Sequence, residues 1–66
     1  MLITVNGTER ELADGATVAD ALAAIAAPPR GIAVALDGEV VRRGAWSDTV
    51  LPPGGAVEVL TAVQGG

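Results

Sequence analysis

The residues of this chain with the clearest chemical potential are its last two, Gly65 and Gly66. Glycine has no Cβ, so a terminal Gly-Gly pair can be threaded into a narrow pocket without blocking an incoming nucleophile. We expect the Gly66 carboxylate to be the reacting group and Gly65 to meet the steric limit of such a pocket in a partner. Gln64 is expected either to contact the mouth of that pocket or to be a solvated tail residue. A frayed chain end without function is the competing interpretation, so the rest of the chain has to decide.

Other side chains suited to covalent chemistry are absent. The sequence contains neither cysteine nor histidine, and its four basic residues are all arginine. There is thus no disulfide framework, no zinc site of the usual spacing, no thiol nucleophile and no imidazole base. A domain of this size buries only about 60% of its unfolded surface, which leaves no room for an enclosed active site. We expect a binding or carrier module that is not an enzyme, with no bound cofactor or metal.

The charge balance is acidic, with four arginines, eight Asp plus Glu and a net charge of −4. Only Arg42 and Arg43 are adjacent, so the clustered basic residues that bind nucleic acid are missing. The acidic surface suits a partner with a basic docking face, or it serves solubility alone. No run is long enough for a membrane span and no signal peptide is evident. We expect a soluble, cytoplasmic protein that is a monomer when free.

The first half of the chain predicts a hairpin followed by a helix. Residues 2–12 contain Asn6-Gly7, the pair most favoured in two-residue type I′ turns, between an apolar and a more polar run. Residues 17–27 are predicted to form the helix. Thr17 and Asp20 match a T-x-x-D variant of the capping box, and Pro28-Pro29 are expected to end the helix. Its apolar stripe consists of Val18, Ala21, Leu22 and Ile25.

The second half predicts the remaining strands. Residues 32–36 are apolar throughout, as expected of an interior strand, and Asp37-Gly38 turns the chain into a short strand at 39–41. Residues 42–50 are predicted to be irregular, with Trp46, the only aromatic residue, covering the edge of the core. A tight turn at 52–55 leads into a last, valine-rich strand over 56–63.

This order of elements predicts a two-layer α+β domain in which one helix covers a mixed sheet of four to five strands. Connection through the helix makes the first and last strands parallel neighbours at the sheet centre. The arrangement is a β-grasp, or ubiquitin-like, roll. We expect residues 1–63 to form this single domain and residues 64–66 to form a flexible Gly-Gly tail projecting from it.

With this order of elements, the chain resembles the ThiS family, the bacterial sulfur carrier proteins of thiamine (thiazole) biosynthesis. The resemblance spans essentially the whole length and is carried by residues 3–7, 17–22 and 32–41, by Arg43 and Trp46, and by residues 57–60 and 63–66. Members of the family commonly have proline where this chain has Arg42, and aspartate where it has Gly55. We interpret both departures as local turn variation that could weaken a partner contact.

The resemblance implies a specific chemistry for Gly66. An E1-like adenylyltransferase of the ThiF type would use ATP to convert the carboxylate to an acyl-adenylate. A sulfur donor such as a cysteine desulfurase persulfide would then replace AMP, leaving a thiocarboxylate from which a ThiG-type thiazole synthase takes sulfur. Leu60, Val63 and Arg43 are candidates for docking these partners, although Leu60 and Val63 could instead be buried under the helix and Arg43 could form a local ion pair.

Three other functions stay open on sequence alone. One is a related β-grasp sulfur carrier for molybdopterin, cysteine or tRNA thiolation. Another is a ubiquitin-like protein modifier, which this lysine-free chain could serve only as donor of an isopeptide bond. The last is a β-grasp binding module whose terminal glycines are incidental.

Overall fold

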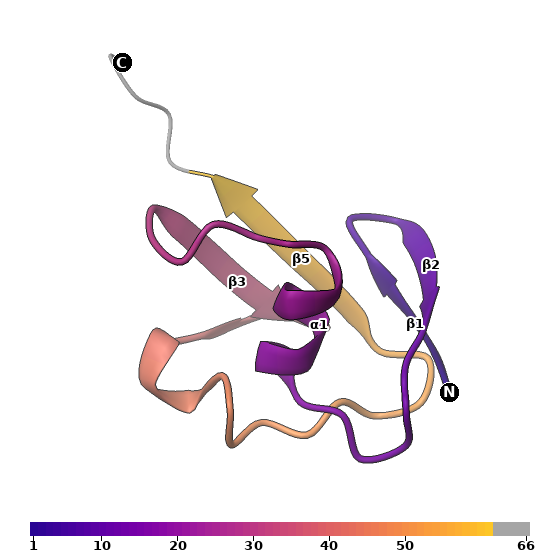
Figure 1. Cartoon of the computed structure of the whole chain (residues 1–66). Helices are drawn as coiled ribbons and strands as arrows, with labels where there is room; N and C mark the ends of the chain where they lie inside the picture. Colours follow the sequence, from indigo (N-terminus) through magenta and orange to yellow (C-terminus); the bar gives the residue numbers. More distant parts are fainter. Residues whose placement is uncertain (62–66) are drawn as a thin grey trace.

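The structure is a computed structural model, and it describes residues 1–61 of the 66-residue chain. A five-stranded mixed sheet and a helix that crosses one of its faces form the two predicted layers of a β-grasp fold (Figure 1). In chain order the elements are β1 Leu2–Val5, β2 Thr8–Glu11, α1 Val18–Ala24, β3 Ile32–Leu36, β4 Glu39–Val41, the 3₁₀ helix η1 Arg43–Ala45, and β5 Ala56–Thr61.

β5 lies at the centre of the sheet, whose strand order is β2-β1-β5-β3-β4. It runs parallel to β1, with Thr4 opposite Ala56 and Val5 opposite Val57, and antiparallel to β3 along its whole length. The predicted parallel pairing of the first and last strands is therefore confirmed. Of the predicted last strand over 56–63, the part that the structure describes ends at Thr61.

Both predicted hairpin turns are present. Asn6 and Gly7 have φ values of 50° and 81°, and Asp37 and Gly38 have values of 50° and 86°. Positive φ at both central residues is the requirement of a type I′ turn, and Asn, Asp and Gly are the residues that meet it at least cost. The two hairpins, β1–β2 and β3–β4, therefore follow from local sequence.

The N-terminus of α1 has the predicted capping box. The Thr17 hydroxyl accepts a hydrogen bond from the Asp20 N–H (3.3 Å), and the Asp20 carboxylate accepts one from the Thr17 N–H (2.9 Å). Two of the N–H groups that a helix start leaves without an intrahelical partner are satisfied in this way. No helix among residues 1–61 is long and apolar enough to cross a membrane.

The predicted end of the helix is wrong, because α1 stops before Pro28-Pro29 are reached. Ala26 adopts a left-handed conformation with φ of 53°. Its N–H donates to the Ala23 carbonyl (3.1 Å), and the Ala27 N–H donates to the Leu22 carbonyl (3.0 Å). These two bonds form a Schellman motif, which closes the helix with alanine at the position where glycine is usual. The prolines follow the end without setting it.

The core lies between α1 and the facing side of the sheet. The predicted helix stripe is confirmed, since Val18, Ala21 and Leu22 are buried and Ile25 is half-buried. Leu51, which lies between the predicted irregular stretch and the predicted turn and was not singled out, is among the most buried side chains, and its N–H donates to the Ala16 carbonyl (2.8 Å). The buried residues are Ile3, Val5, Ala16, Val18, Ala21, Leu22, Val34, Leu51, Val57 and Val59.

Candidate functional site

The predicted reactive residues Gly66, Gly65 and Gln64, together with Val63, lie outside the residues that the structure describes. The site is therefore built from the part of the chain that leads to them, namely β5 and its neighbours. Their roles stay predictions.

β5 is a firmly held base for whatever follows it in the chain. Val57 and Val59 are buried on the face that α1 covers, while Glu58 and Leu60 point to the opposite, open face of the sheet. The strand pairs with β3 as far as Thr61, opposite Ile32. Burial on one face and hydrogen-bonded neighbours in the sheet plane fix both the direction and the register of the strand.

The open face carries an exposed apolar surface next to the end of β5. Leu60 is 69% exposed and Val40 is 82% exposed, so neither is buried under the helix. Register places Ala33 opposite Leu60, and Ala35 opposite Val40. We call these four residues the open-face patch. Its position matches the expectation of an apolar surface near the tail, although it contains Val40, which the sequence did not single out.

A shallow hollow deepens one end of this surface. Its volume is about 320 Å³, and its lining comes from the start of β3 and the end of β5: Gly31, Ile32, Ala33, Leu60 and Thr61. The walls are mostly apolar and carry no charged side chain. The hollow can accept an apolar side chain of a docking partner, directly beside the residue that leads into the tail.

Arg43, the third candidate for docking, is held by neighbours that are not acidic. Its Nη1 donates to the Pro29 carbonyl, and its guanidinium lies 5.1 Å from the centre of the Trp46 ring. Trp46 is half-buried against the core, as predicted, and its indole N–H donates to the Val41 carbonyl (2.8 Å). These contacts fix the Arg43 side chain over the ring, a geometry typical of a cation–π pair.

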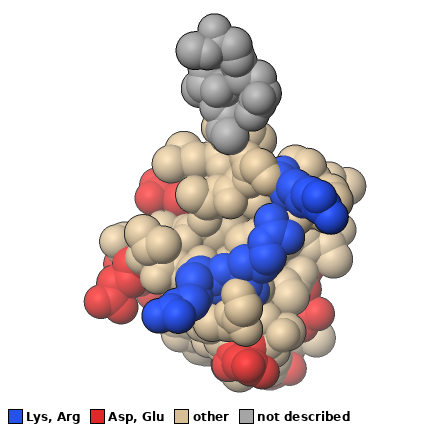
Figure 2. Space-filling view, turned by 90° about the vertical axis from the view of Figure 1, so that its left-hand side faces the viewer, with Lys and Arg blue, Asp and Glu red and all other residues tan. Residues whose placement is uncertain are grey.

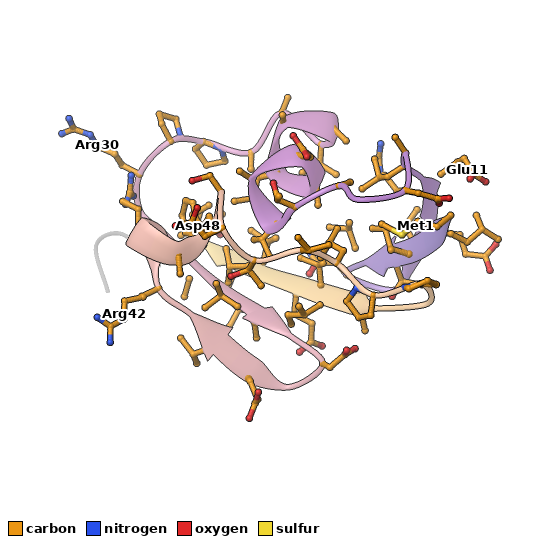
Figure 3. All side chains as sticks on the ribbon, turned by 90° about the horizontal axis from the view of Figure 1, so that it is seen from below. Met1, Glu11, Arg30, Arg42 and Asp48 are labelled. Carbon is orange, nitrogen blue, oxygen red and sulfur yellow. The ribbon has the colours of Figure 1, made fainter. Side chains whose placement is uncertain are left out.

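Three of the four arginines gather on one side of the molecule. Blue side chains form a band across the face seen in Figure 2, and Figure 3 shows Arg30 and Arg42 pointing outward at the same end. Arg43 joins them through its bond to Pro29, the residue before Arg30. We call Arg30, Arg42 and Arg43 the arginine band. Among residues 1–61, salt bridges involve only the Met1 ammonium, so the band has no carboxylate within 4 Å.

Two turn residues contact β5 in a way that the sequence did not reveal. The Asn6 side chain bonds both main-chain polar groups of Val59, and the Asp37 carboxylate accepts from the N–H of Ala56 (2.9 Å). From the sequence, these two residues are predicted only to form turns. Asn in one turn and Asp in the other are the only signal of these contacts in the sequence. That signal can be interpreted only when the strand beside each turn is known.

Among residues 1–61, no three acidic side chains lie close enough together to hold a metal ion. The two departures from the family pattern lie at opposite ends of the sheet. Arg42 follows β4 and precedes η1, on the side where β5 ends, and Gly55 is buried in the turn before β5, where a Cβ would come within 3.0 Å of the Pro52 carbonyl oxygen.

Comparisons with known proteins extend over the whole chain. A model of the ThiS family matches residues 3–66. The crystal structure of the thiamine biosynthesis protein (ThiS) from Geobacter metallireducens is similar with a TM-score of 0.83 and 36% identity, and all of both chains is covered. The NMR solution structure of a thiamine biosynthesis protein from the same organism gives 0.77 and 36%, covering 100% of this chain and 88% of that one. A search among curated proteins found no match.

Proposed function

The chain belongs to the ThiS family, and we propose that its Gly66 carboxylate carries the sulfur used to make the thiazole of thiamine. Membership of the family implies a small sulfur carrier protein of thiamine biosynthesis and not a catalyst. The observation that carries the proposal is the extent of the family match, which reaches from residue 3 to residue 66 and so includes the terminal Gly-Gly pair.

The chemistry begins with activation of the carboxylate. A ThiF-type adenylyltransferase joins a Gly66 oxygen to the α-phosphate of ATP and releases pyrophosphate, which converts a poor electrophile into a mixed anhydride. A persulfide sulfur attacks the carbonyl carbon, and AMP leaves. The product is an acyl disulfide joined to Gly66 by a new C–S bond. A thiol then cleaves the S–S bond that came from the persulfide, giving a disulfide on the donor side and a thiocarboxylate on Gly66. A ThiG-type thiazole synthase takes that sulfur, and the carboxylate returns.

The amino-acid composition supports the carboxylate as the place of attachment. The sequence has no cysteine, so the chain cannot carry sulfur as a persulfide of its own. The chain supplies position and its partners supply catalysis. We propose residues 1–63 as the domain that positions the tail, with Gly65 and Gln64 passing through the channel of the adenylating enzyme.

Docking of the partners is assigned to two neighbouring surfaces. The open-face patch, centred on Leu60, offers exposed apolar area beside the end of β5, and Val63 is proposed as a further docking residue. The arginine band, which includes Arg43, offers positive charge on a molecule whose net charge is −4. Apolar area with a charged border is the usual composition of a transient interface.

The test is intact-mass analysis of the protein after incubation with ATP, its ThiF-type enzyme and a persulfide donor. The expected product gains the mass difference of one oxygen replaced by sulfur, and fragmentation places the change on Gly66. A chain lacking Gly66 is the matched control and stays unmodified. The proposal fails if a competent enzyme gives neither adenylate nor thiocarboxylate. An isopeptide-linked Gly-Gly remnant on lysines of other proteins would instead identify a protein modifier.

A further inference from the structure

We propose that Asn6 is a positioning residue whose side chain holds the second half of β5, and hence the origin of the tail, in place. The effect of Asn6 on β5 follows from the contacts of its side chain. Its effect on adenylation of the carrier rests in addition on the proposed function.

The main-chain pairing of β1 with β5 ends before β5 does. The last main-chain bond between them runs from the Asn6 N–H to the Val57 carbonyl (2.9 Å). At Gly7 the chain turns away into β2. β5 continues to Thr61, with β3 still paired on its other edge. On the β1 side, the main-chain groups of Val59 would therefore lose their partner.

The Asn6 side chain takes the place of the missing strand residue. Its Oδ1 accepts a hydrogen bond from the Val59 N–H (2.8 Å), and its Nδ2 donates to the Val59 carbonyl (3.2 Å). A carboxamide offers the same donor and acceptor as a peptide group, so the pair continues the pattern of the sheet by one more step. It joins residues that are 53 apart in sequence.

The need for both bonds explains why asparagine occupies this position. With φ of 50° the turn accepts Asn, Asp or Gly at low cost. Only asparagine among the three brings both a donor and an acceptor. Turn geometry alone would therefore accept any of the three residues at position 6, whereas the contact with Val59 selects one.

The second hairpin provides an internal comparison. Asp37 has the same φ of 50°, its carboxylate accepts from the Ala56 N–H (2.9 Å), and its own N–H donates to the Ala56 carbonyl (2.8 Å). Asp37 therefore holds the first residue of β5 from the β3 side, and Asn6 holds Val59 from the β1 side. The two contacts are alike in kind, but only that of Asn6 lies near the tail.

Loss of the Asn6 contact should affect docking more than chemistry. Without it, the main-chain N–H and C=O of Val59 have no partner in the sheet, and the end of β5 opens more often. A partner that binds Leu60 and the tail must then order that segment on binding, and this ordering opposes association. The Michaelis constant for the carrier rises, whereas the turnover of the bound carrier stays the same.

The experiment compares Asn6→Gly, Asn6→Asp and Asp37→Gly with the parent chain. Glycine keeps the positive φ of each turn and removes the side-chain bonds, and aspartate keeps the acceptor for the Val59 N–H but not the donor. Amide hydrogen exchange is read at Val59 and Ala56 against the Leu51 N–H, which bonds Ala16 elsewhere in the core. Steady-state adenylation by the ThiF-type enzyme gives KM and kcat for each carrier.

For Asn6→Gly we expect exchange at Val59 to rise about 10-fold relative to Leu51 and KM to rise about 3- to 10-fold, the range set by the loss of one or two hydrogen bonds, with kcat unchanged. Asn6→Asp keeps Val59 protected and shows a smaller rise in KM. Asp37→Gly exposes Ala56 to exchange and leaves KM at the parent value.

Two results would overturn the proposal. One is unchanged protection of Val59 in Asn6→Gly; the other is a rise in KM no larger than that in Asp37→Gly. If the parent chain itself is not adenylated, the proposed function fails, and hydrogen exchange still decides whether Asn6 holds β5. Trp46 fluorescence reports whether each variant is folded.

Discussion

At the scale of single residues, the Met1 ammonium group has an unusually well-defined setting. It donates to the Glu11 carboxylate and to the Leu12 carbonyl, both at 2.7 Å, and lies 3.4 Å from an Asp14 carboxylate oxygen. Figure 3 shows Met1 and Glu11 together at the end of the molecule opposite Arg30 and Arg42. The hydrogen bond to Glu11 is the main cause that raises the pKa of the α-amino group above its ordinary 8.0.

This setting predicts that stability falls in alkaline solution. Because the pKa is raised on folding, the ammonium stabilises the folded state fully below pH 8, and that stabilisation is lost as the pH rises through the folded pKa. The chain has no histidine, cysteine, tyrosine or lysine, the side chains whose ordinary pKa lies between about 6 and 11. Urea unfolding followed by Trp46 fluorescence from pH 7 to 11 should show one falling step.

Glu11→Gln is the control for this prediction. It removes the larger of the two carboxylate contacts, so the decline between pH 8 and 11 should become shallower. An equal decline in the variant and the parent would show that the contact with Glu11 does not cause the effect.

Residue-scale contacts were predictable from sequence where they are local and not where they span the chain. The Thr17–Asp20 capping box was predicted because its two residues are three apart and depend on nothing beyond the helix start. The contact of Asn6 with Val59 was not, because it exists only once β5 lies beside β1. Leu60 was correctly suspected as exposed apolar surface, and its role in docking remains a prediction.

At the scale of elements, the C-terminus of α1 contains a conformational cost. Ala26 holds φ of 53° in the Schellman motif, a left-handed conformation that disfavours any residue with a Cβ. Ala26→Gly should therefore raise the free energy of unfolding by about 1 kcal/mol, since glycine adopts this conformation freely. Urea unfolding measured by Trp46 fluorescence checks the value.

Ala23→Gly is the matched control within the same helix. Ala23 is exposed and lies inside α1 with ordinary helical geometry, so glycine there should lower the free energy of unfolding by about 0.5–1 kcal/mol. If Ala26→Gly destabilises the domain as Ala23→Gly does, the Schellman motif does not impose the expected strain.

The strands were predicted more accurately than the helix end. Strong local patterns place β1 to β4, since each hairpin has its own Asn-Gly or Asp-Gly turn. The end of α1 was placed too late because Ile25 continues the apolar stripe and Pro28-Pro29 were expected to end the helix, whereas the backbone has already turned at Ala26. Leu51 was missed for a related reason: an irregular segment has no periodicity, so burial of one residue within it leaves no pattern to read.

At the scale of the whole molecule, positive charge is segregated on an acidic protein. The net charge is −4, yet the arginine band lies on one side, and Arg10 lies apart on β2. Residue counts predicted the acidity but not this separation, because residues 30, 42 and 43 meet only through the packing of η1 against the loop before β3. We infer that the band meets an acidic area on the adenylating enzyme.

Charge reversal separates the place of the charge from its amount. Arg42→Glu and Arg10→Glu each exchange +1 for −1, so both change the net charge from −4 to −6. Arg42→Glu should slow association with the ThiF-type enzyme about 3- to 10-fold at low salt, and Arg10→Glu less than about 2-fold, because steering depends on charge near the interface. The difference should disappear near 1 M salt. Equal effects would exclude the band from docking.

The central position of β5 has a mechanical consequence. A force applied to the chain's C-terminal end along this strand acts parallel to it and loads its bonds to β1 and β3 in shear. All of these hydrogen bonds then carry the force together. They do not break one after another, as the bonds of an edge strand do when it is pulled away sideways. The side chains of Asn6 and Asp37 add hydrogen bonds to β5, one on each edge of the strand. Under the proposed function, an enzyme that draws the tail into a channel would therefore pull on it without peeling β5 from the sheet.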